Sequence, residues 1–338
     1  MHSLLLSHET IIQSLRKRHL LSHAEVRVTP LGGGVSSEIY LLEDGNRKLV
    51  VKHALPKLKV ADEWQADISR NQVEQRFIRY AQAHVPQNVL PIILSDDEHC
   101  FFVMEFLDEG FKTWKEHLFA GRFDEKVSRA AARLLATLHK VSWNDTVARE
   151  QFSTSDNFDA LRVHPYLITT GMRNPPLRGY FEQEAERLLA SRLALVHGDF
   201  SPKNIMIRDE HLILLDHEVA CFGDPAFDLA FLLNHIFLKS LVVVNGSACL
   251  QLAATVWREY FDTLGNHREK TLGAGATSLL LMLMLARIDG KSPVEYLEGR
   301  EKQRQIVRNF VFELLPAGIN DFTQVHTQWL RQLSATWK

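Results

Sequence analysis

The chain has 338 residues, of which 46% are hydrophobic and 24% are charged. These ordinary values exclude a wholly disordered chain, and the length predicts one large or two medium domains. The net charge of −2 lacks the basic surplus of a nucleic-acid-binding protein, so we expect no nucleic-acid partner, although a local basic groove stays possible.

Targeting and cysteine signals are weak along the whole chain. The N-terminal segment MHSLLLSHETIIQSLRKRH lacks a cleavage site, and the longest apolar run, 279–286, is far shorter than the roughly 20 residues of a membrane span. Cys100, Cys221 and Cys249 are too few and too scattered for a disulfide framework or a zinc site, and we interpret them as buried thiols. We therefore expect a cytoplasmic protein without a membrane partner.

The first 107 residues are predicted to be rich in β-strands. Alternating apolar and polar residues predict five strands, over residues 25–31, 38–44, 48–55, 88–96 and 100–107. GGGVSS forms a turn after the first strand, and Asp44–Gly45 signals a hairpin. Residues 68–85 carry apolar side chains at helical spacing and predict the one helix of this region.

From residue 108 onward the chain is predicted to be mostly helical. The predicted helices cover residues 124–143, 178–192, 225–242, 248–265 and 278–288 and much of 301–338. Two short strand pairs interrupt them within residues 195–231. The polar shift at DEGFKTW separates a predicted small lobe, residues 1–107, from a larger helical lobe, residues 108–338, and the cleft between two such lobes commonly holds a ligand.

A glycine-rich turn, a lysine and a glutamate stand out in the predicted small lobe. The glycines of LGGGVSSEIY let backbone amides approach an anion closely, although such turns are also common without a function. Lys52 lies in the apolar run LVVKHA, where it either pairs with a counter-charge or faces solvent. A lysine on the third strand and a glutamate such as Glu74 in the following helix resemble the ion pair that orients nucleotide phosphates in protein kinases.

The segment HGDFSPKNI carries the strongest chemical signal, because Asp199 and Asn204 have the spacing of a kinase catalytic loop. An attacking hydroxyl needs a carboxylate that orients it and takes its proton, and Asp199 fits this role. Phosphates need Mg²⁺, which prefers oxygen ligands, so we predict Asn204 and Asp216 as metal ligands and Glu218 as a ligand that binds directly or through water. The alternative is that HGD is a simple turn and that Asp216 caps a strand.

The motifs HGDFSPKNI, LLDHE and GDPAFDLA resemble the aminoglycoside phosphotransferase and choline kinase group of small-molecule kinases, over about residues 25–240. This resemblance implies an α+β, bilobal, protein-kinase-like fold, with a five-stranded antiparallel sheet and one helix in the small lobe. It also implies ATP and Mg²⁺ as cofactors, a small-molecule hydroxyl acceptor, and a monomer or homodimer. HGD in place of His-Arg-Asp and the missing Ala-Pro-Glu segment disfavour peptide substrates.

The resemblance also implies roles for single residues. Asp199 would be the catalytic base, Asn204 and Asp216 would bind Mg²⁺, and Lys52 would contact the phosphates with Glu74 as its partner. The predicted nucleotide contacts are Gly33, Gly34, Ser36 and Ser37 over the triphosphate, and Met104, Glu105 and Leu107 at the adenine hinge. Asp228 would brace the catalytic loop, and Lys203 would either touch the γ-phosphate or lie on the surface.

The acceptor is the least determined part of the prediction. The segment VVKHALPKLKVADEW, followed by Arg70 and Glu74, is similar to methylthioribose kinases and suggests a sugar or another polyol, whereas SPKN departs from them. An amino alcohol or an aminoglycoside is the alternative, but an aminoglycoside is a polycation and the sequence after residue 286 has no acidic run. Arg287, Asp289 and Lys291 either face the acceptor or end a solvated helix. A catalytically inactive nucleotide-binding scaffold is the alternative of another class.

Overall fold

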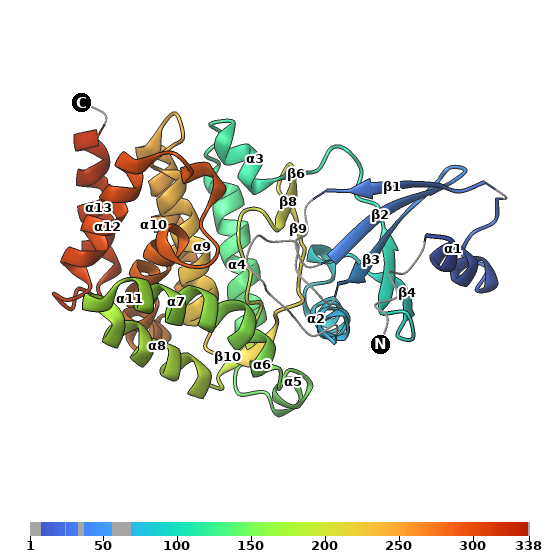
Figure 1. The fold of residues 1–338 in the computed structure, drawn as a ribbon, viewed down its shortest axis with the longest axis horizontal. Coiled ribbons are helices and arrows are strands. Elements are labelled where there is room, and N and C mark those ends of the chain that lie inside the picture. Colours follow the sequence, from blue (N-terminus) through green and yellow to red (C-terminus); the bar gives the residue numbers. More distant parts are fainter. Residues whose placement is uncertain (1–7, 24, 33–36, 56–68, 337–338) are drawn as a thin grey trace.

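The computed structural model describes residues 8–23, 25–32, 37–55 and 69–336, and it shows an α+β protein with two lobes. A five-stranded antiparallel sheet dominates the small lobe, at the right of Figure 1, and helices form the larger lobe at the left. The predicted α+β, bilobal fold class is confirmed.

The predicted strands of the small lobe form, each within a few residues of its predicted bounds. They are β1 (Arg27–Leu31), β2 (Ser37–Asp44), β3 (Arg47–Ala54), β4 (Ile92–Asp96) and β5 (Phe101–Glu105). Their order in the sheet is β1-β2-β3-β5-β4, and all neighbouring strands are antiparallel. The predicted hairpin joins β2 to β3, but its two-residue turn is Gly45–Asn46, one residue later than expected.

Among the described residues, two α-helices flank this sheet, whereas the sequence pattern predicted one. The predicted helix is α2 (Arg70–His84), and the additional one is α1 (His8–Lys17). The short α1 was missed because it carries few apolar residues. Helix α2 also packs against the large lobe, since the ring of Phe77 lies 6.4 Å from that of Phe152. The core of the molecule therefore crosses from one lobe to the other through α2.

The alternation of side chains along β3 decides where Lys52 points. Val51 packs in the apolar cluster that includes residues of α1, on one face of the sheet. Val50 packs on the opposite face, in a cluster with Ile78 of α2. Because side chains two residues apart share a face, Lys52 lies on the same side as Val50 and faces α2.

The large lobe contains the helices that the sequence predicted and several short ones that it did not. The helices are α3 (Trp114–Phe119), α4 (Glu125–Val141), α5 (Thr146–Gln151), α6 (Ser155–Phe158), α7 (Thr169–Arg173), α8 (Arg178–Ala190), α9 (Ala226–Lys239), α10 (Gly246–Leu264), α11 (Glu269–Asp289), α12 (Glu301–Leu314) and α13 (Phe322–Thr336). A π-helical segment, η2 (Asp159–Ile168), and 3₁₀ turns including η5 (Glu295–Leu297) connect them.

Helix α9 forms the centre of the large lobe, and every one of its residues is buried. Helix α11 begins nine residues before the predicted start of this helix at residue 278, and it packs against α9. The segment Asn266–Asp289, which includes α11, is the one helix of the described residues that is long and apolar enough to cross a membrane, and most of it is buried inside the protein. Cys221 and Cys249 are buried as expected, whereas Cys100 is only half-buried.

Short strands also belong to the large lobe. One pair is β7 (Ala194–Val196) with β10 (Cys221–Gly223), and the other group is β6 (Lys112–Thr113), β8 (Ile205–Arg208) and β9 (His211–Leu214). The strands β6, β8 and β9 lie between the helices of this lobe and the five-stranded sheet in Figure 1. The predicted catalytic and metal-binding residues lie near the ends of β7, β8 and β9.

Candidate active site

The β8–β9 hairpin brings Asn204 and Asp216 together. Ile205 pairs with Leu214, so Asn204, just before β8, lies opposite Leu215, just after β9, and the amide of Leu215 donates to the Asn204 carbonyl at 2.9 Å. Asp216 is the next residue, and its backbone has a φ of 66°, in the left-handed region that few residues other than glycine adopt. Two predicted oxygen ligands are therefore neighbours because of one antiparallel register.

A buried carboxylate holds the loop that carries Asp199. Asp228, at the start of α9, accepts hydrogen bonds from the amides of His197 at 2.6 Å and Gly198 at 2.8 Å. Gly198 has a φ of 78°, and a Cβ there would lie 2.9 Å from the Val219 carbonyl oxygen, so the turn requires glycine. Asp228 lies where the family resemblance implied a loop-bracing residue.

Asp199 is a buried carboxylate between two cations. Its Oδ2 lies 2.9 Å from the Lys203 ammonium and 3.2 Å from the Arg162 guanidinium, and its carbonyl accepts a hydrogen bond from Asn204 Nδ2 at 2.9 Å. Burial raises the pKa of Asp199, but Lys203 and Arg162 outweigh this effect and hold the pKa below its ordinary value. The carboxylate is therefore ionised at neutral pH. The same hydrogen bond turns the amide oxygen of Asn204 away from Asp199.

Lys52 joins the two lobes through two ion pairs. Its Nζ lies 2.8 Å from Glu74 Oε1 on α2 and 2.7 Å from Asp216 Oδ1 in the large lobe. Burial lowers the pKa of Lys52, but the carboxylates of Asp216 and Glu74 more than compensate and raise it. Burial raises the pKa of Asp216 too, but Lys52 and Lys203 hold it well below its ordinary value. The lysine therefore stays charged and one oxygen of Asp216 is engaged.

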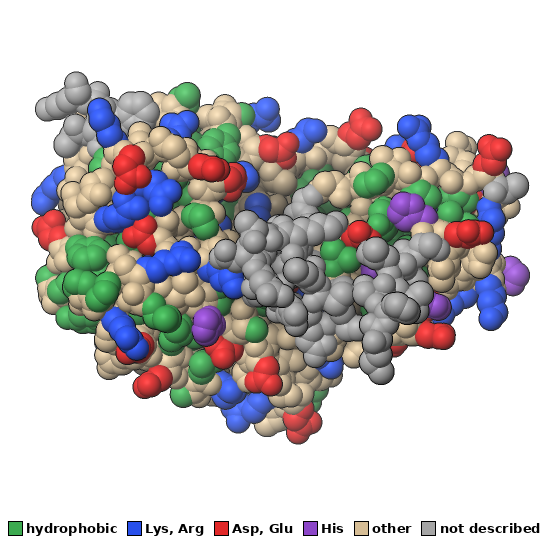
Figure 2. Space-filling model, in the orientation of Figure 1, with side chains coloured by type: hydrophobic (Ala, Val, Ile, Leu, Met, Phe, Trp, Pro, Cys, Tyr) green, Lys and Arg blue, Asp and Glu red, His purple; other side chains and the backbone are tan. Residues whose placement is uncertain are grey.

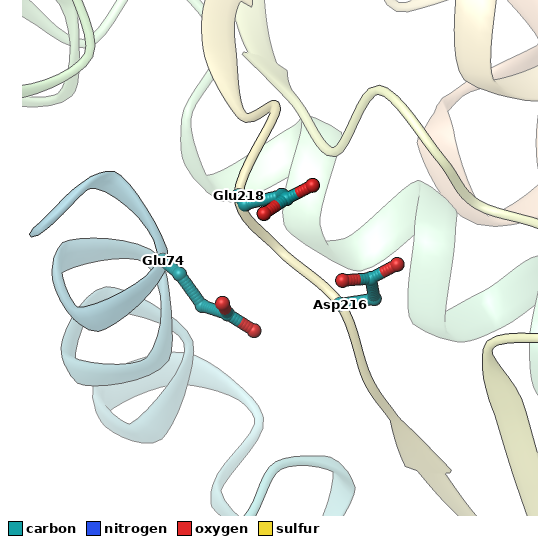
Figure 3. A group of neighbouring side chains, drawn as sticks. All are labelled: Glu74, Asp216 and Glu218. Carbon is teal, nitrogen blue, oxygen red and sulfur yellow. The ribbon is translucent and has the colours of Figure 1, made fainter. Parts of the chain in front are cut away.

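Glu74, Asp216 and Glu218 form a compact acidic cluster, drawn in Figure 3. One oxygen of each carboxylate lies within 4.8 Å of one oxygen of the others. Two cations enter this cluster, since Arg70 Nε lies 3.1 Å from Glu218 Oε2 and Lys52 pairs with the other two acids. Burial is the main cause that raises the pKa of Glu74, and its acidic neighbours add to it despite Lys52.

A cavity of about 240 Å³ opens beside these groups. Its walls include four of the residues predicted for nucleotide binding, namely Ser37, Lys52, Glu74 and Met104, together with Asn204 and Asp216. Apolar wall residues are Ile39, Ile78, Leu90, Met206 and Leu214. The cavity thus combines apolar walls with a charged end, as a nucleotide requires.

The predicted nucleotide contacts are only partly gathered around this cavity. Of the hinge residues, Glu105 and Leu107 are not among the described residues that line it. Gly33, Gly34 and Ser36 lie outside the described residues.

Arg162 was not predicted, although it is central to the site. It lies on η2, is buried, and contacts both Asp199 and the carbonyl of Gly198 through its guanidinium. The sequence did contain a signal for Arg162. An arginine in the apolar run ALRVHPYLI needs a charged or polar partner if that run is buried. Of the three charged residues predicted near the acceptor, Arg287 faces inward to the Tyr166 hydroxyl at 3.0 Å, whereas Asp289 pairs with Arg308 at 2.8 Å.

Comparisons with known proteins find several kinases that are similar to this chain. The methylthioribose kinase of Bacillus mycoides (strain KBAB4) is 24% identical over 265 residues, which cover 70% of this chain and 67% of that protein. A choline kinase from Cryptosporidium parvum Iowa II superposes with a TM-score of 0.60 at 12% identity, over 93% of this chain and 98% of that one. The ternary complex of streptomycin, ATP and APH(2")-IIa superposes with a TM-score of 0.51 at 19% identity, over 90% of this chain and 97% of that one.

These likenesses establish the protein-kinase-like fold that the sequence predicted. The matched segment spans only about two thirds of the length of the methylthioribose kinases. The sequence pattern of the family described as the phosphotransferase enzyme family matches residues 27–263, well over half of this chain. The chain therefore belongs to the phosphotransferase enzyme family and is a small-molecule kinase with a hydroxyl acceptor.

Proposed function

We propose that this phosphotransferase transfers the γ-phosphate of ATP to a hydroxyl group of a small polyol, with a sugar as the leading candidate. One observation carries the proposal: Asp199, Asn204 and Asp216 converge beside Lys52, although Lys52 lies 164 residues from Asp216 in the sequence. The printed names of the relatives, methylthioribose kinases, support a sugar-like acceptor. An amino alcohol is the second candidate.

Nucleotide binding in this proposal uses residues of both lobes. Lys52, held by Glu74, neutralises the phosphates, and Ser37 and Met104 contact the nucleotide from the cavity wall. The residues that would hold Mg²⁺ are Asn204, through its amide oxygen, and Asp216, through the oxygen that Lys52 does not engage. Glu218 is a further candidate. These oxygen donors fit a hard cation, which would neutralise charge on the transferred phosphoryl group.

The remaining predicted contacts are proposed on the family resemblance alone. They are Gly33, Gly34 and Ser36 over the triphosphate and the backbone of Glu105 and Leu107 at the adenine ring.

Asp199 would orient the acceptor hydroxyl and accept its proton. The hydroxyl oxygen attacks the γ-phosphorus, the bond from that phosphorus to the β,γ-bridging oxygen breaks, and ADP leaves. Because the pKa of Asp199 is low, the proton moves late, once the attacking oxygen has begun to bond to phosphorus. Most of the rate enhancement then comes from positioning and charge neutralisation. Arg162 and Lys203, both in contact with Asp199, are placed to offset charge on the phosphoryl oxygens.

Two alternatives follow from the family and are less well supported. An aminoglycoside would bring several positive charges next to Arg162 and Lys203, which disfavours it electrostatically. A catalytically inactive scaffold is disfavoured because each predicted catalytic group of the described residues has its expected neighbours. We further propose that the lobes are residues 1–107 and residues 108–338. We also propose that the protein is cytoplasmic and is a monomer or homodimer that binds neither nucleic acid nor membrane.

Acceptor-stimulated ADP release tests the proposal. Sugars, polyols, amino alcohols and aminoglycosides are supplied separately with MgATP, and a coupled assay measures ADP. Asp199→Asn should lower kcat by about 100-fold to 10,000-fold while leaving nucleotide affinity nearly unchanged. Asp209→Asn, the same chemical change at an exposed turn residue, is the matched control. Nucleotide binding without ADP release from any acceptor would support the scaffold instead, and full activity of Asp199→Asn would exclude this residue as the base.

A further inference from the structure

Several buried polar groups lie on the acceptor side of Asp199 and lack protein partners. His235 and Lys239 on α9 are only 4% and 2% exposed. Neither ring nitrogen of His235 has a hydrogen-bond partner among the described residues, and the same holds for the Tyr296 hydroxyl and for Arg287 Nε. Lys239 Nζ forms no hydrogen bond or ion pair with the described residues, and it lies 6.0 Å from the centre of the Phe119 ring and 4.5 Å from that of Tyr296. Buried polar groups are nearly always paired, so an unpaired group of this kind indicates a ligand site.

Contacts and charge interactions link these groups, together called the acceptor wall, to the catalytic carboxylate. Arg162, which pairs with Asp199, lies with its guanidinium carbon 5.8 Å from the Tyr166 ring, and Arg287 donates to the Tyr166 hydroxyl at 3.0 Å. Further from Asp199, Lys239 lies 4.5 Å from the centre of the Tyr296 ring. A single small molecule could therefore touch Asp199 at one end and the basic groups at the other.

A π-helix shapes the near part of this wall. Both Arg162 and Tyr166 lie on η2, a π-helical segment with Pro165 inside it. Such segments are rare and occur frequently at functional sites. Proline has no amide hydrogen to donate to the helix, which favours an irregular turn here. The local backbone therefore turns both side chains toward the catalytic carboxylate.

The wall carries an excess of positive charge. Its cations are Lys115, Arg162, Lys203, Lys239 and Arg287, and its carboxylates are Asp199 and Glu295; Asp216, beside Lys52, also acts on Arg162 and Lys203. Glu295 is paired with Lys115, and Asp199 is shared by Lys203 and Arg162. On the face of the molecule drawn in Figure 2, by contrast, basic and acidic side chains are interspersed.

Lys239 is the group most in need of a counter-charge. The ionisable groups that surround it are His235 on α9, Lys115 on α3, Cys249 on α10, Arg287 on α11 and Glu295 on η5. Burial lowers the pKa of Lys239 to about 7, and Lys115 is the next largest cause. A buried ammonium without an anionic partner destabilises the folded protein, so an anionic ligand would relieve a cost already present in the free protein.

We propose that the acceptor carries a carboxylate or phosphate group in addition to its hydroxyl, and that Lys239, Arg287, His235 and Tyr296 bind this anion. The inference rests on the proposed function and narrows it from a neutral polyol to an anionic one. In this arrangement the hydroxyl contacts Asp199, while the anion neutralises Lys239 and accepts hydrogen bonds from Arg287 and Tyr296. The proposal differs from acceptor sites that take cationic amino alcohols or aminoglycosides, where a cationic wall would repel the substrate.

Matched acceptor pairs test the preference. Each pair shares a carbon skeleton and differs only in the anion, for example gluconate with glucitol, glycerate with glycerol, and ribose 5-phosphate with ribose. The kcat/KM of the anionic member should exceed that of its neutral partner by about 30-fold or more, mainly through KM. Lys239→Met should remove most of this ratio by lowering kcat/KM for the anionic member. Equal or better turnover of the neutral members by the wild-type enzyme overturns the proposal.

A binding experiment tests the proposed anion site without requiring that the natural acceptor be known. The nucleotide site is saturated with Mg²⁺ and a non-hydrolysable ATP analogue, and inorganic phosphate or gluconate is then titrated calorimetrically. Saturable binding should weaken by about tenfold or more in Lys239→Met and in Arg287→Met. It should be unchanged in Lys126→Met, whose lysine is 69% exposed and serves as the matched control. Absence of saturable binding to the wild-type protein, or equal binding to all variants, overturns the proposal.

The stability of the free protein separates a ligand role from a structural one. Lys239→Met removes an unpaired buried charge, so the variant should be at least as stable as the wild type while it binds the anion less well. A variant that loses both stability and anion binding contradicts the proposal. If neutral polyols are phosphorylated and Asp199→Asn stops the reaction, but no anion preference is found, only the anion inference fails. If nucleotide binds and no hydroxyl compound stimulates ADP release, the proposed function fails instead.

Discussion

Asp228→Asn is the substitution whose effect follows most directly from the structure. Asp228 is fully buried, and both of its oxygens are occupied: Oδ1 accepts from the Gly198 amide, and Oδ2 accepts from the His197 amide and contacts His139 Nε2 at 3.2 Å. Asparagine keeps one oxygen and replaces the other with an NH₂ group. That NH₂ group must face one of the two backbone amides, so a donor meets a donor and one amide loses its partner.

The size of the effect follows from these lost bonds. An unsatisfied buried amide costs about 1–3 kcal/mol, and hydrogen bonds to a charged acceptor are about twice as strong as neutral ones. We therefore expect Asp228→Asn to lower the free energy of unfolding by about 3 kcal/mol. The loop also loses the support that positions Asp199, and a displacement of about 1 Å can cost about 100-fold in kcat. Asp228 would thus be a positioning residue.

Urea unfolding followed by tryptophan fluorescence measures the first effect, and the coupled ADP assay on folded protein measures the second. Asp262→Asn, which makes the same change at an exposed position on α10, is the control and should match the wild type. An unchanged urea midpoint for Asp228→Asn would refute the hydrogen-bond argument. A lower midpoint with wild-type kcat would leave the stability argument intact and refute the positioning role.

Three further predictions concern single residues of the site. Lys52→Met removes the nearest counter-charge of the Asp216 carboxylate, so we expect kcat at saturating ATP to fall by about 100-fold or more, and wild-type turnover would contradict this role. Gly198→Ala places a methyl group against the Val219 carbonyl at a φ of 78°, which should cost about 2 kcal/mol in urea unfolding; a neutral result would show that the turn can relax. Because the pKa of Lys239 is about 7 in the folded protein, against an ordinary value of 10.5, the unfolded chain binds more protons between these pH values. The stability of the wild type relative to Lys239→Met should therefore rise from about pH 7 to about pH 10 and stay level below that range, and a flat difference in urea unfolding would argue that the lysine is solvated.

Much of the candidate site could be predicted because its residues are close in sequence. Asp199, Asn204 and Asp216 lie within one short stretch, and an antiparallel hairpin between them places Asn204 beside Asp216. The Lys52–Glu74 pair was predictable for a related reason, since strand alternation and helix periodicity each decide which face a side chain occupies. The spacing of these residues along the sequence was therefore enough to predict the centre of the candidate site.

The acceptor wall could not be predicted in the same way. His235 and Lys239 lie in a helix that is apolar on all sides, so the sequence does not show which of its polar residues face a ligand. Arg162 lies in a segment whose π-helical geometry has no distinct sequence period, and Tyr296 belongs to a short turn far along the chain. Their proximity depends on the packing of α9 against α11.

The sequence by itself determined the class of reaction and the local spacing from which the catalytic loop and the metal-ligand pair are predicted, because turns and hairpins are set by residues a few positions apart. The tertiary structure alone decided that Lys52 reaches Asp216 across the two lobes and that Arg162 shares Asp199 with Lys203. It also decided that unpaired basic groups gather on the acceptor side. Those contacts join residues distant in sequence, and only the packing of buried apolar surfaces, above all those of α2 and α9, brings them within the range of an ion pair.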